Sequence, residues 1–128
     1  MTVVHAIHDG LFELAEDGSI TLVGGYSPTS GHYHFPLQET CPYSGAADVQ
    51  RVALSRDATL WSWTAVTTAP PGYTGEVPFG FGVVELAPER LRVITRLRES
   101  DPGRLEYGQP MTLVAEELPG GVVTWAFA

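Results

Sequence analysis

The sequence predicts a mainly β protein, built as a small closed or partly closed antiparallel barrel. Fourteen glycines and ten prolines are spread over 128 residues and leave little room for long helices. Six short runs are instead rich in apolar, aromatic and β-branched residues and are separated by turn residues. These runs cover 49–54, 59–66, 79–86, 90–98, 111–117 and 122–127. Short strands at this spacing are typical of small barrels.

Two of the runs carry tryptophans or glycines at positions that predict local geometry. Trp61 and Trp63 are two residues apart, so they would share one strand face and pack as core or interface anchors. Gly80 and Gly82 also fall on one face, which predicts a bend or a close backbone approach. The sequence Leu-Pro-Gly-Gly at 118–121 predicts a hairpin between the last two runs.

Apolar residues and arginines alternate along the run 90–98. This period of two predicts a strand with an apolar face and an arginine face. The apolar set is Leu91, Val93 and Leu97, and the arginine set is Arg90, Arg92, Arg96 and Arg98.

Only two helical turns are expected. One covers 10–16. The other covers 101–105, where Asp101 would cap the turn and Pro102 would take the first helical position.

Charge and cysteine content limit the classes of function. The net charge is −8, all seven cations are arginines, and five of these lie between residues 90 and 104. A chain this acidic is a poor general nucleic-acid binder, because phosphate backbones attract concentrated positive charge. A single cysteine excludes an internal disulfide framework and fits a reducing cytoplasm, which is the location we expect. The uncharged stretch 60–75 is too interrupted for a membrane helix, and we expect no signal peptide and no membrane partner.

The segment 24–47 contains two short turns that resemble zinc knuckles. Each has the outline of a C-x2-C-G motif, but only one of the four ligand positions is a cysteine. The four positions are Ser27, Ser30, Cys41 and Ser44. A serine hydroxyl is a poor zinc ligand, so we expect no zinc and no other resident cofactor. The alternative is a site of Cys41, His32 and His34 with water as a fourth ligand.

The order of motifs resembles the family with a rubredoxin-like zinc ribbon and an OB-fold, known as domain of unknown function 35. The resemblance runs from about residue 11 to 117 and departs from the family only at the zinc ligands. Its main blocks are Phe35-Pro36, Cys41-Pro42, 60–64, 69–73, 78–86 and 108–111. It implies an N-terminal segment (1–23), a degenerate zinc-ribbon-like segment (24–48) and an OB-fold domain (49–128).

The resemblance also implies a role as a partner subunit. Members of this family bind thiolase-superfamily enzymes, including thiolases and the acyl-CoA aldolases of steroid side-chain breakdown, and help to form the acyl-CoA site. The chain is therefore expected to be a non-catalytic subunit of a hetero-oligomer in lipid or steroid catabolism, with acyl-CoA as a ligand of the complex.

Two groups of residues are candidates for contact with a ligand or partner. The arginine run offers guanidinium groups suited to the phosphates of CoA, to an acidic patch on a partner, or to plain solvation. The loop 67–78 is stiffened by two prolines, carries a tyrosine and suits docking. The candidates are Arg90, Arg92, Arg96, Arg98, Pro70, Pro71, Tyr73 and Phe79.

Two other functions remain open from the sequence. An OB-fold module that binds single-stranded nucleic acid would use the aromatic residues, although a basic groove is missing. A small enzyme acting on an acyl thioester would need a catalytic group. Cys41 has no cationic neighbour in sequence, and the four histidines are scattered near Asp9 and Glu39 without a recognisable motif.

Overall fold

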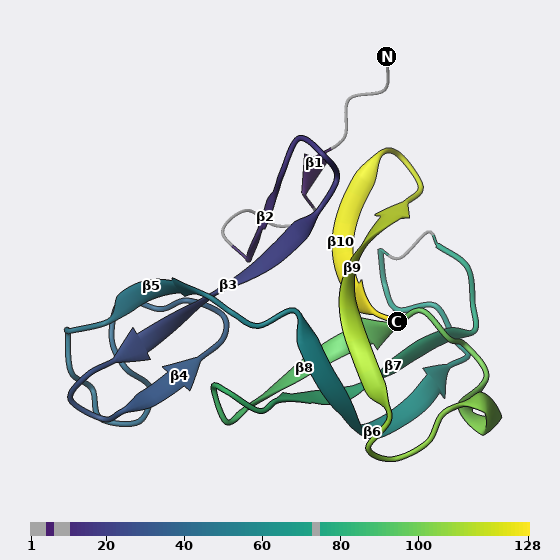
Figure 1. Cartoon of the computed structure of the whole chain (residues 1–128). Helices are drawn as coiled ribbons and strands as arrows, with labels where there is room; N and C mark the ends of the chain where they lie inside the picture. Colours follow the sequence, from purple (N-terminus) through teal and green to yellow (C-terminus); the bar gives the residue numbers. More distant parts are fainter. Residues whose placement is uncertain (1–4, 7–10, 73–74) are drawn as a thin grey trace.

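The computed structural model describes residues 5–6, 11–72 and 75–128, and it shows two β-sheets joined into one molecule (Figure 1). The larger sheet contains β1 (His5–Ala6), β6 (Asp57–Val66), β7 (Phe79–Leu86), β8 (Leu91–Leu97), β9 (Pro110–Leu118) and β10 (Val122–Phe127). The smaller sheet contains β2 (Phe12–Leu14), β3 (Ile20–Ser27), β4 (His32–His34) and β5 (Gln50–Ala53). The prediction of a mainly β protein is confirmed. The described part of the chain has no helix with the length and hydropathy needed to span a membrane.

Five strands of the larger sheet close into a barrel. β6, β7 and β8 form an antiparallel meander, β9 and β10 form a hairpin, and β9 pairs with β6. The ring is completed by β10 and β8, where Ala126 and Phe127 pair in parallel with Arg96 and Leu97. The expectation of an entirely antiparallel barrel is therefore wrong at this one joint. A closed ring with an odd number of strands cannot alternate in direction throughout, so one neighbouring pair must be parallel.

Five of the six predicted runs form the barrel strands, with ends shifted by at most two residues. The sixth, at 49–54, is β5, which belongs to the smaller sheet and pairs with β3. The expected helical turn at 10–16 is wrong within its described residues, because Phe12–Leu14 form β2 and place the Phe12 ring in the core. The turn at 101–105 is confirmed as a 3-10 helix, Pro102–Arg104, capped by the Asp101 carboxylate.

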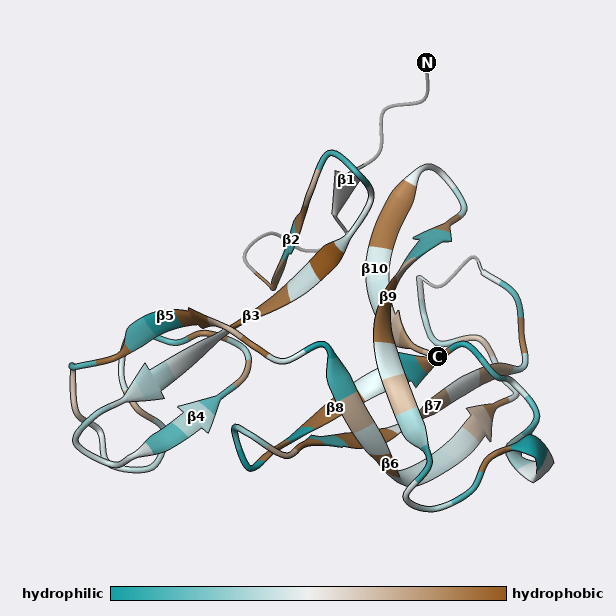
Figure 2. Ribbon diagram, viewed as in Figure 1, coloured by the Kyte–Doolittle hydropathy of each residue, from teal (hydrophilic) through white to brown (hydrophobic). Residues whose placement is uncertain are grey.

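One hydrophobic core serves both sheets. Phe12, Ile20 and Leu22 of the smaller sheet belong to the same buried cluster as the inward side chains of the barrel. The Trp125 ring on β10 lies between them, with its centroid 6.1 Å from that of Phe12 and 5.6 Å from that of Phe35. Figure 2 shows hydrophobic and polar positions alternating along the barrel strands. The smaller sheet is thus packed onto the barrel by shared apolar side chains.

The alternation predicted for the arginine run is confirmed on its apolar side. Leu91, Val93 and Leu97 are all buried. The close approach predicted at the two glycines of β7 is also confirmed. A Cβ on Gly80 would lie 2.1 Å from the carbonyl oxygen of Glu99, so no larger residue fits without moving the backbone.

Candidate interaction site

The two degenerate knuckles close on each other at the far end of the smaller sheet. The Ser30 hydroxyl lies 3.3 Å from the Cys41 thiol, and the Ser30 backbone N–H donates to the Ser27 hydroxyl at 3.4 Å. Gly31 and Gly45 end the two turns in the left-handed region, with φ of 71° and 74°. Because β3 runs from Ile20 to Ser27, the first knuckle is the direct continuation of a strand that begins before residue 24.

Hydroxyl groups and a carboxylate hold this cluster together. Asp48 accepts hydrogen bonds from the hydroxyls of Ser27 at 2.7 Å and Thr29 at 2.6 Å, and from the Thr29 backbone N–H. These bonds, led by that of the Thr29 hydroxyl, lower the pKa of the Asp48 carboxyl to about 2. The hydroxyls of Ser30 and Ser44 beside the buried Cys41 lower the pKa of its thiol to about 6.

The alternative metal site of Cys41, His32 and His34 does not form. Nε2 of His34 accepts a hydrogen bond from the Gln38 backbone N–H at 3.3 Å, and the His32 ring packs on Tyr43. Across the described residues, no three side chains of His, Cys, Asp or Glu lie close enough to share a metal ion.

The four arginines of the predicted strand face separate into different settings. Only Arg92 and Arg96 lie on β8; Arg90 occupies the turn before it, with a φ of 52°, and Arg98 follows it. The Arg92 guanidinium lies 4.1 Å above the Trp61 ring, and its Nε is 3.3 Å from Glu85. The predicted row of four arginines on one strand face is therefore only partly present.

The prediction that Trp61 and Trp63 share a face is wrong. A β-bulge in β6 shifts the register between Leu60 and Ser62, which adds one residue and reverses the alternation. Trp61 is consequently exposed, whereas Trp63 is half-buried and its indole N–H donates to the Pro102 carbonyl at 3.1 Å.

The bulge helps to create an exposed apolar surface on the barrel, which we call the outer face and define as Trp61, Phe81 and Ile94. These side chains come from β6, β7 and β8 and are 40%, 38% and 63% exposed. The strand register makes the outer face continuous, because Ile94 pairs with Val83, two residues from Phe81. Phe81 and Ile94 were not predicted as site residues. The signal for Ile94 was present, since it occupies an outward position between two arginines.

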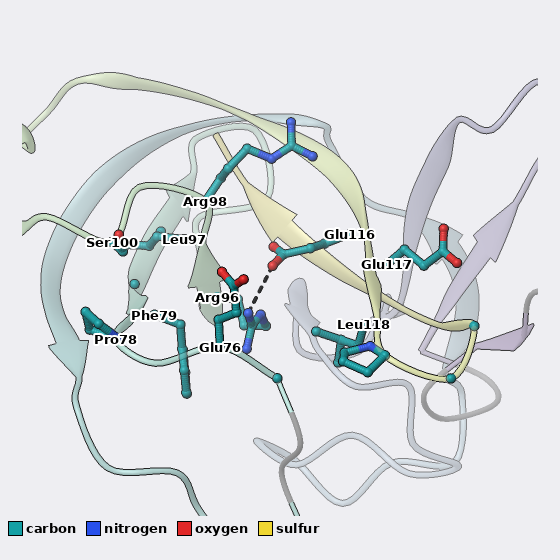
Figure 3. A pocket seen from close by; sticks show the side chains of 15 residues that line it. Glu76, Pro78, Phe79, Arg96, Leu97, Arg98, Ser100, Glu116, Glu117 and Leu118 are labelled. Atoms are coloured by element: carbon teal, nitrogen blue, oxygen red, sulfur yellow. Dashed lines mark hydrogen bonds and ion pairs between the residues drawn. The ribbon is translucent and has the colours of Figure 1, made fainter.

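A cleft of about 620 Å³ opens beside the outer face, between the loop that precedes β7, the end of β8 and the β9–β10 hairpin (Figure 3). Arg96 lies in it, with Nη2 2.9 Å from Glu116 and its guanidinium 4.5 Å from the centre of the Phe79 ring. Arg98 also lines the cleft. The other predicted site residues that the structure describes do not line the cleft. Pro70 and Pro71 are exposed in the loop, and Arg90 and Arg92 lie outside the cleft lining. Tyr73 falls outside the described residues.

Comparison with known proteins identifies the barrel. Residues 51–116, just over half of the chain, match the model of the C-terminal OB-fold domain of ChsH2. The chain belongs to this OB-fold family. The order of the five barrel strands, closed by a parallel pair, agrees with an OB-fold. The resemblance stated from the motifs and the predicted OB-fold are therefore confirmed.

A curated relative and a solved structure extend this comparison. The benzoylsuccinyl-CoA thiolase subunit BbsA of Thauera aromatica is 32% identical over 97 residues, which cover 75% of this chain and 65% of that protein. The chain thus matches slightly less than two thirds of its curated relative. A chain of the solved Ltp2-ChsH2(DUF35) aldolase superposes with a TM-score of 0.67 at 23% identity, covering 84% of this OB-fold protein and 83% of that chain. At this identity the second likeness shows the fold.

Proposed function

We propose that this OB-fold protein is a non-catalytic subunit that docks onto a thiolase-like acyl-CoA enzyme, either a thiolase or an aldolase of lipid or steroid side-chain breakdown. The observation that carries the proposal is the similarity to BbsA, which is named as a subunit of a thiolase. The fold shared with a chain of the Ltp2-ChsH2 aldolase supports it. We further propose that the complex works in the cytoplasm and that this chain brings no metal of its own.

The outer face has the composition expected of a docking surface. Aromatic residues and arginine are enriched at the centres of protein interfaces, where burial excludes water from large side chains. Trp61, Phe81 and Ile94 are exposed together, and Arg92 lies over the Trp61 ring. Glu85 already pairs with Arg92, so covering this face would not bury an unpaired charge. These features support a protein partner rather than solvation.

The same pairs favour a partner contact over a site for the phosphates of CoA. Arg92 and Arg96, the two arginines on β8, each lie beside a carboxylate and over an aromatic ring. A phosphate at either guanidinium would have to compete with that carboxylate and would be repelled by it. In this proposal the enzyme subunit supplies the catalytic groups, and the present chain completes the rim of its acyl-CoA site.

Co-expression with a thiolase-family protein from the same host tests the proposal. We expect the two to co-purify as a stable complex, with turnover of acyl-CoA that depends on both chains. Failure to associate, or full activity and stability of the enzyme alone, would contradict the proposed function.

Two variants test the outer face. Ile94→Asp places a charge at the most exposed residue of the outer face and should weaken association roughly tenfold or more, the size of effect found for the residues that dominate an interface. Leu14→Asp makes the same kind of change at an exposed leucine of the smaller sheet and should leave association unchanged. Equal effects of the two variants would contradict the assignment of the outer face.

A further inference from the structure

The cleft between the two loops carries an excess of negative charge. Its ionisable lining comprises Glu76, Glu116 and Glu117 against Arg96 and Arg98. In Figure 3 the side chains of Glu76, Arg96 and Glu116 gather in the middle of the cleft, whereas Arg98 and Glu117 extend toward its edges. The middle of the cleft therefore holds two carboxylates and one guanidinium.

The one guanidinium in the middle, that of Arg96, is already paired with a carboxylate. Arg96 donates to Oε1 of Glu116 at 2.9 Å and stacks on the Phe79 ring, and its side chain is only 17% exposed. A phosphate or carboxylate ligand would have to displace Glu116 and would also face Glu76. The charge of the cleft thus opposes an anionic ligand and favours a cationic one.

Glu116 also has unused capacity to accept hydrogen bonds. Its Oε1 is bonded to Arg96, but its Oε2 is shielded from water and has no hydrogen-bond partner. A carboxylate oxygen in this state is costly, and a charged donor that reached it would recover that cost. The Glu116 side chain lines the cleft and is 23% exposed, so a donor that enters the cleft can approach its carboxylate.

The remaining walls suit the stem of a long basic side chain. Pro78, Leu118 and Pro119 provide apolar surface along the cleft. Arginine and lysine bury their methylene stems against such surface while the charged end meets acidic groups. A cleft with apolar walls and acidic groups in its middle matches this combination of properties.

We propose that the cleft accepts a basic side chain, an arginine or a lysine, presented by the enzyme subunit to which this chain docks. The inference rests on the proposed function only for the source of the side chain, which is the enzyme subunit. The acidic groups and apolar residues of the cleft are the reason for expecting a basic side chain. The net charge of −8 acts in the same direction, because it would attract a basic surface over a longer range.

A titration of the isolated, isotope-labelled full chain followed by NMR tests the chemistry of the cleft without the enzyme. The probes are acetyl-arginine methylamide, its uncharged analogue acetyl-citrulline methylamide, and coenzyme A. We expect the arginine probe to shift the amide signals of Leu97, Glu116 and Gly120 saturably, with a dissociation constant of about millimolar size. Citrulline should bind roughly tenfold more weakly, and coenzyme A should leave these signals unchanged. Saturable shifts by coenzyme A, equal binding of arginine and citrulline, or no saturable shift by arginine would overturn the proposal.

Variants connect this measurement to assembly. Glu76→Gln and Glu116→Gln should each weaken arginine binding roughly three- to tenfold, while Glu39→Gln, the same change at an exposed position between β4 and β5, should have no effect. Glu76 is exposed, so its variant remains informative if loss of the Glu116 charge impairs folding. In the complex, Glu76→Gln should weaken association in low salt more than in high salt. If NMR shows saturable binding of the arginine probe but the chain never associates with a thiolase-family enzyme, the proposed function is contradicted. The conclusion that the cleft binds a basic group would then remain supported.

Discussion

Restoring cysteine at the three serine positions of the knuckles should convert the hydroxyl cluster into a zinc site. The variant combines Ser27→Cys, Ser30→Cys and Ser44→Cys with the native Cys41. The backbone turns that a zinc knuckle requires are already formed: the N–H groups of the two glycines that end the turns bond back to the carbonyls of residues 27 and 41, each at 2.8 Å. This part of the fold therefore has the turn geometry of a zinc knuckle without the cysteine ligands.

The distances support the substitution. Zinc bonds to thiolate are about 2.3 Å long, so the sulfurs of a tetrahedral site lie about 3.8 Å apart. The Ser30 hydroxyl and the Cys41 sulfur are separated by 3.3 Å, so a change of about half an ångström would accommodate the metal. With a dissociation constant on the order of nanomolar and about ten micromolar free zinc, binding would stabilise the folded chain by about 5 kcal/mol. The cost is the loss of the bond from Ser27 to Asp48.

Elemental analysis and thermal unfolding measure the outcome. The triple variant should contain about one equivalent of zinc and should unfold at a markedly lower temperature after chelation. The native chain, as the matched control, should contain well under one equivalent and should be insensitive to chelators. A folded triple variant that binds no zinc would show that the two knuckles are not held at ligand distance. Stoichiometric zinc in the native chain, lost on Cys41→Ser, would show that hydroxyl positions do not prevent binding here.

Three further perturbations follow from contacts in the two sheets. Gly80→Ala should lower the free energy of unfolding by about 3 kcal/mol or more in denaturant titrations, because its Cβ would meet the Glu99 carbonyl; an unchanged midpoint would contradict the close approach. The pKa of Asp48 is lowered in the folded state, so its contribution to stability is present above pH 3.8 and is lost as the pH falls toward about 2; Asp48→Asn should remove this part of the pH dependence, measured by urea unfolding at each pH. Ser30→Ala should raise the pKa of the Cys41 thiol from about 6, seen as a shift in the pH dependence of thiolate absorbance, and an unchanged titration would exclude this hydroxyl as the main cause.

The barrel was predictable because its strands carry their own signals. Each of its five runs shows β-rich composition or alternation and is bounded by turn residues, and β8 keeps its apolar positions on the inner face. Apart from β5, the strands of the smaller sheet lack such signals. β2 and β4 have three residues each, and β3 includes two glycines in its middle, so these strands are defined by pairing across the sheet.

The candidate site was predictable only in part, for a related reason. Arg96, Arg98 and Phe79 were found from the sequence and do line the cleft. Their partners were not found, because Glu116 lies on another strand and reaches Arg96 only after the barrel closes. The outward position of Trp61 was missed because it depends on a bulge, which results from the pairing of β6 with β7. Local pattern identifies strand faces, but contacts between strands decide which charges are already neutralised.

The parallel joint between β8 and β10 has a consequence for how the molecule reaches its folded state. The meander of β6, β7 and β8 involves neighbours in sequence and can assemble locally, but the closing pair joins Arg96 to Ala126, across the whole β9–β10 hairpin. Closing a loop of this length costs chain entropy before any contact repays it, and topologies rich in such contacts refold slowly for their size. Until that step, the inner faces of β8 and β10 and the Trp125 side chain have no partners across the joint. Before the barrel closes, the meander is therefore an open sheet with an exposed apolar face. The rate of barrel closure sets how long this face is available for aggregation.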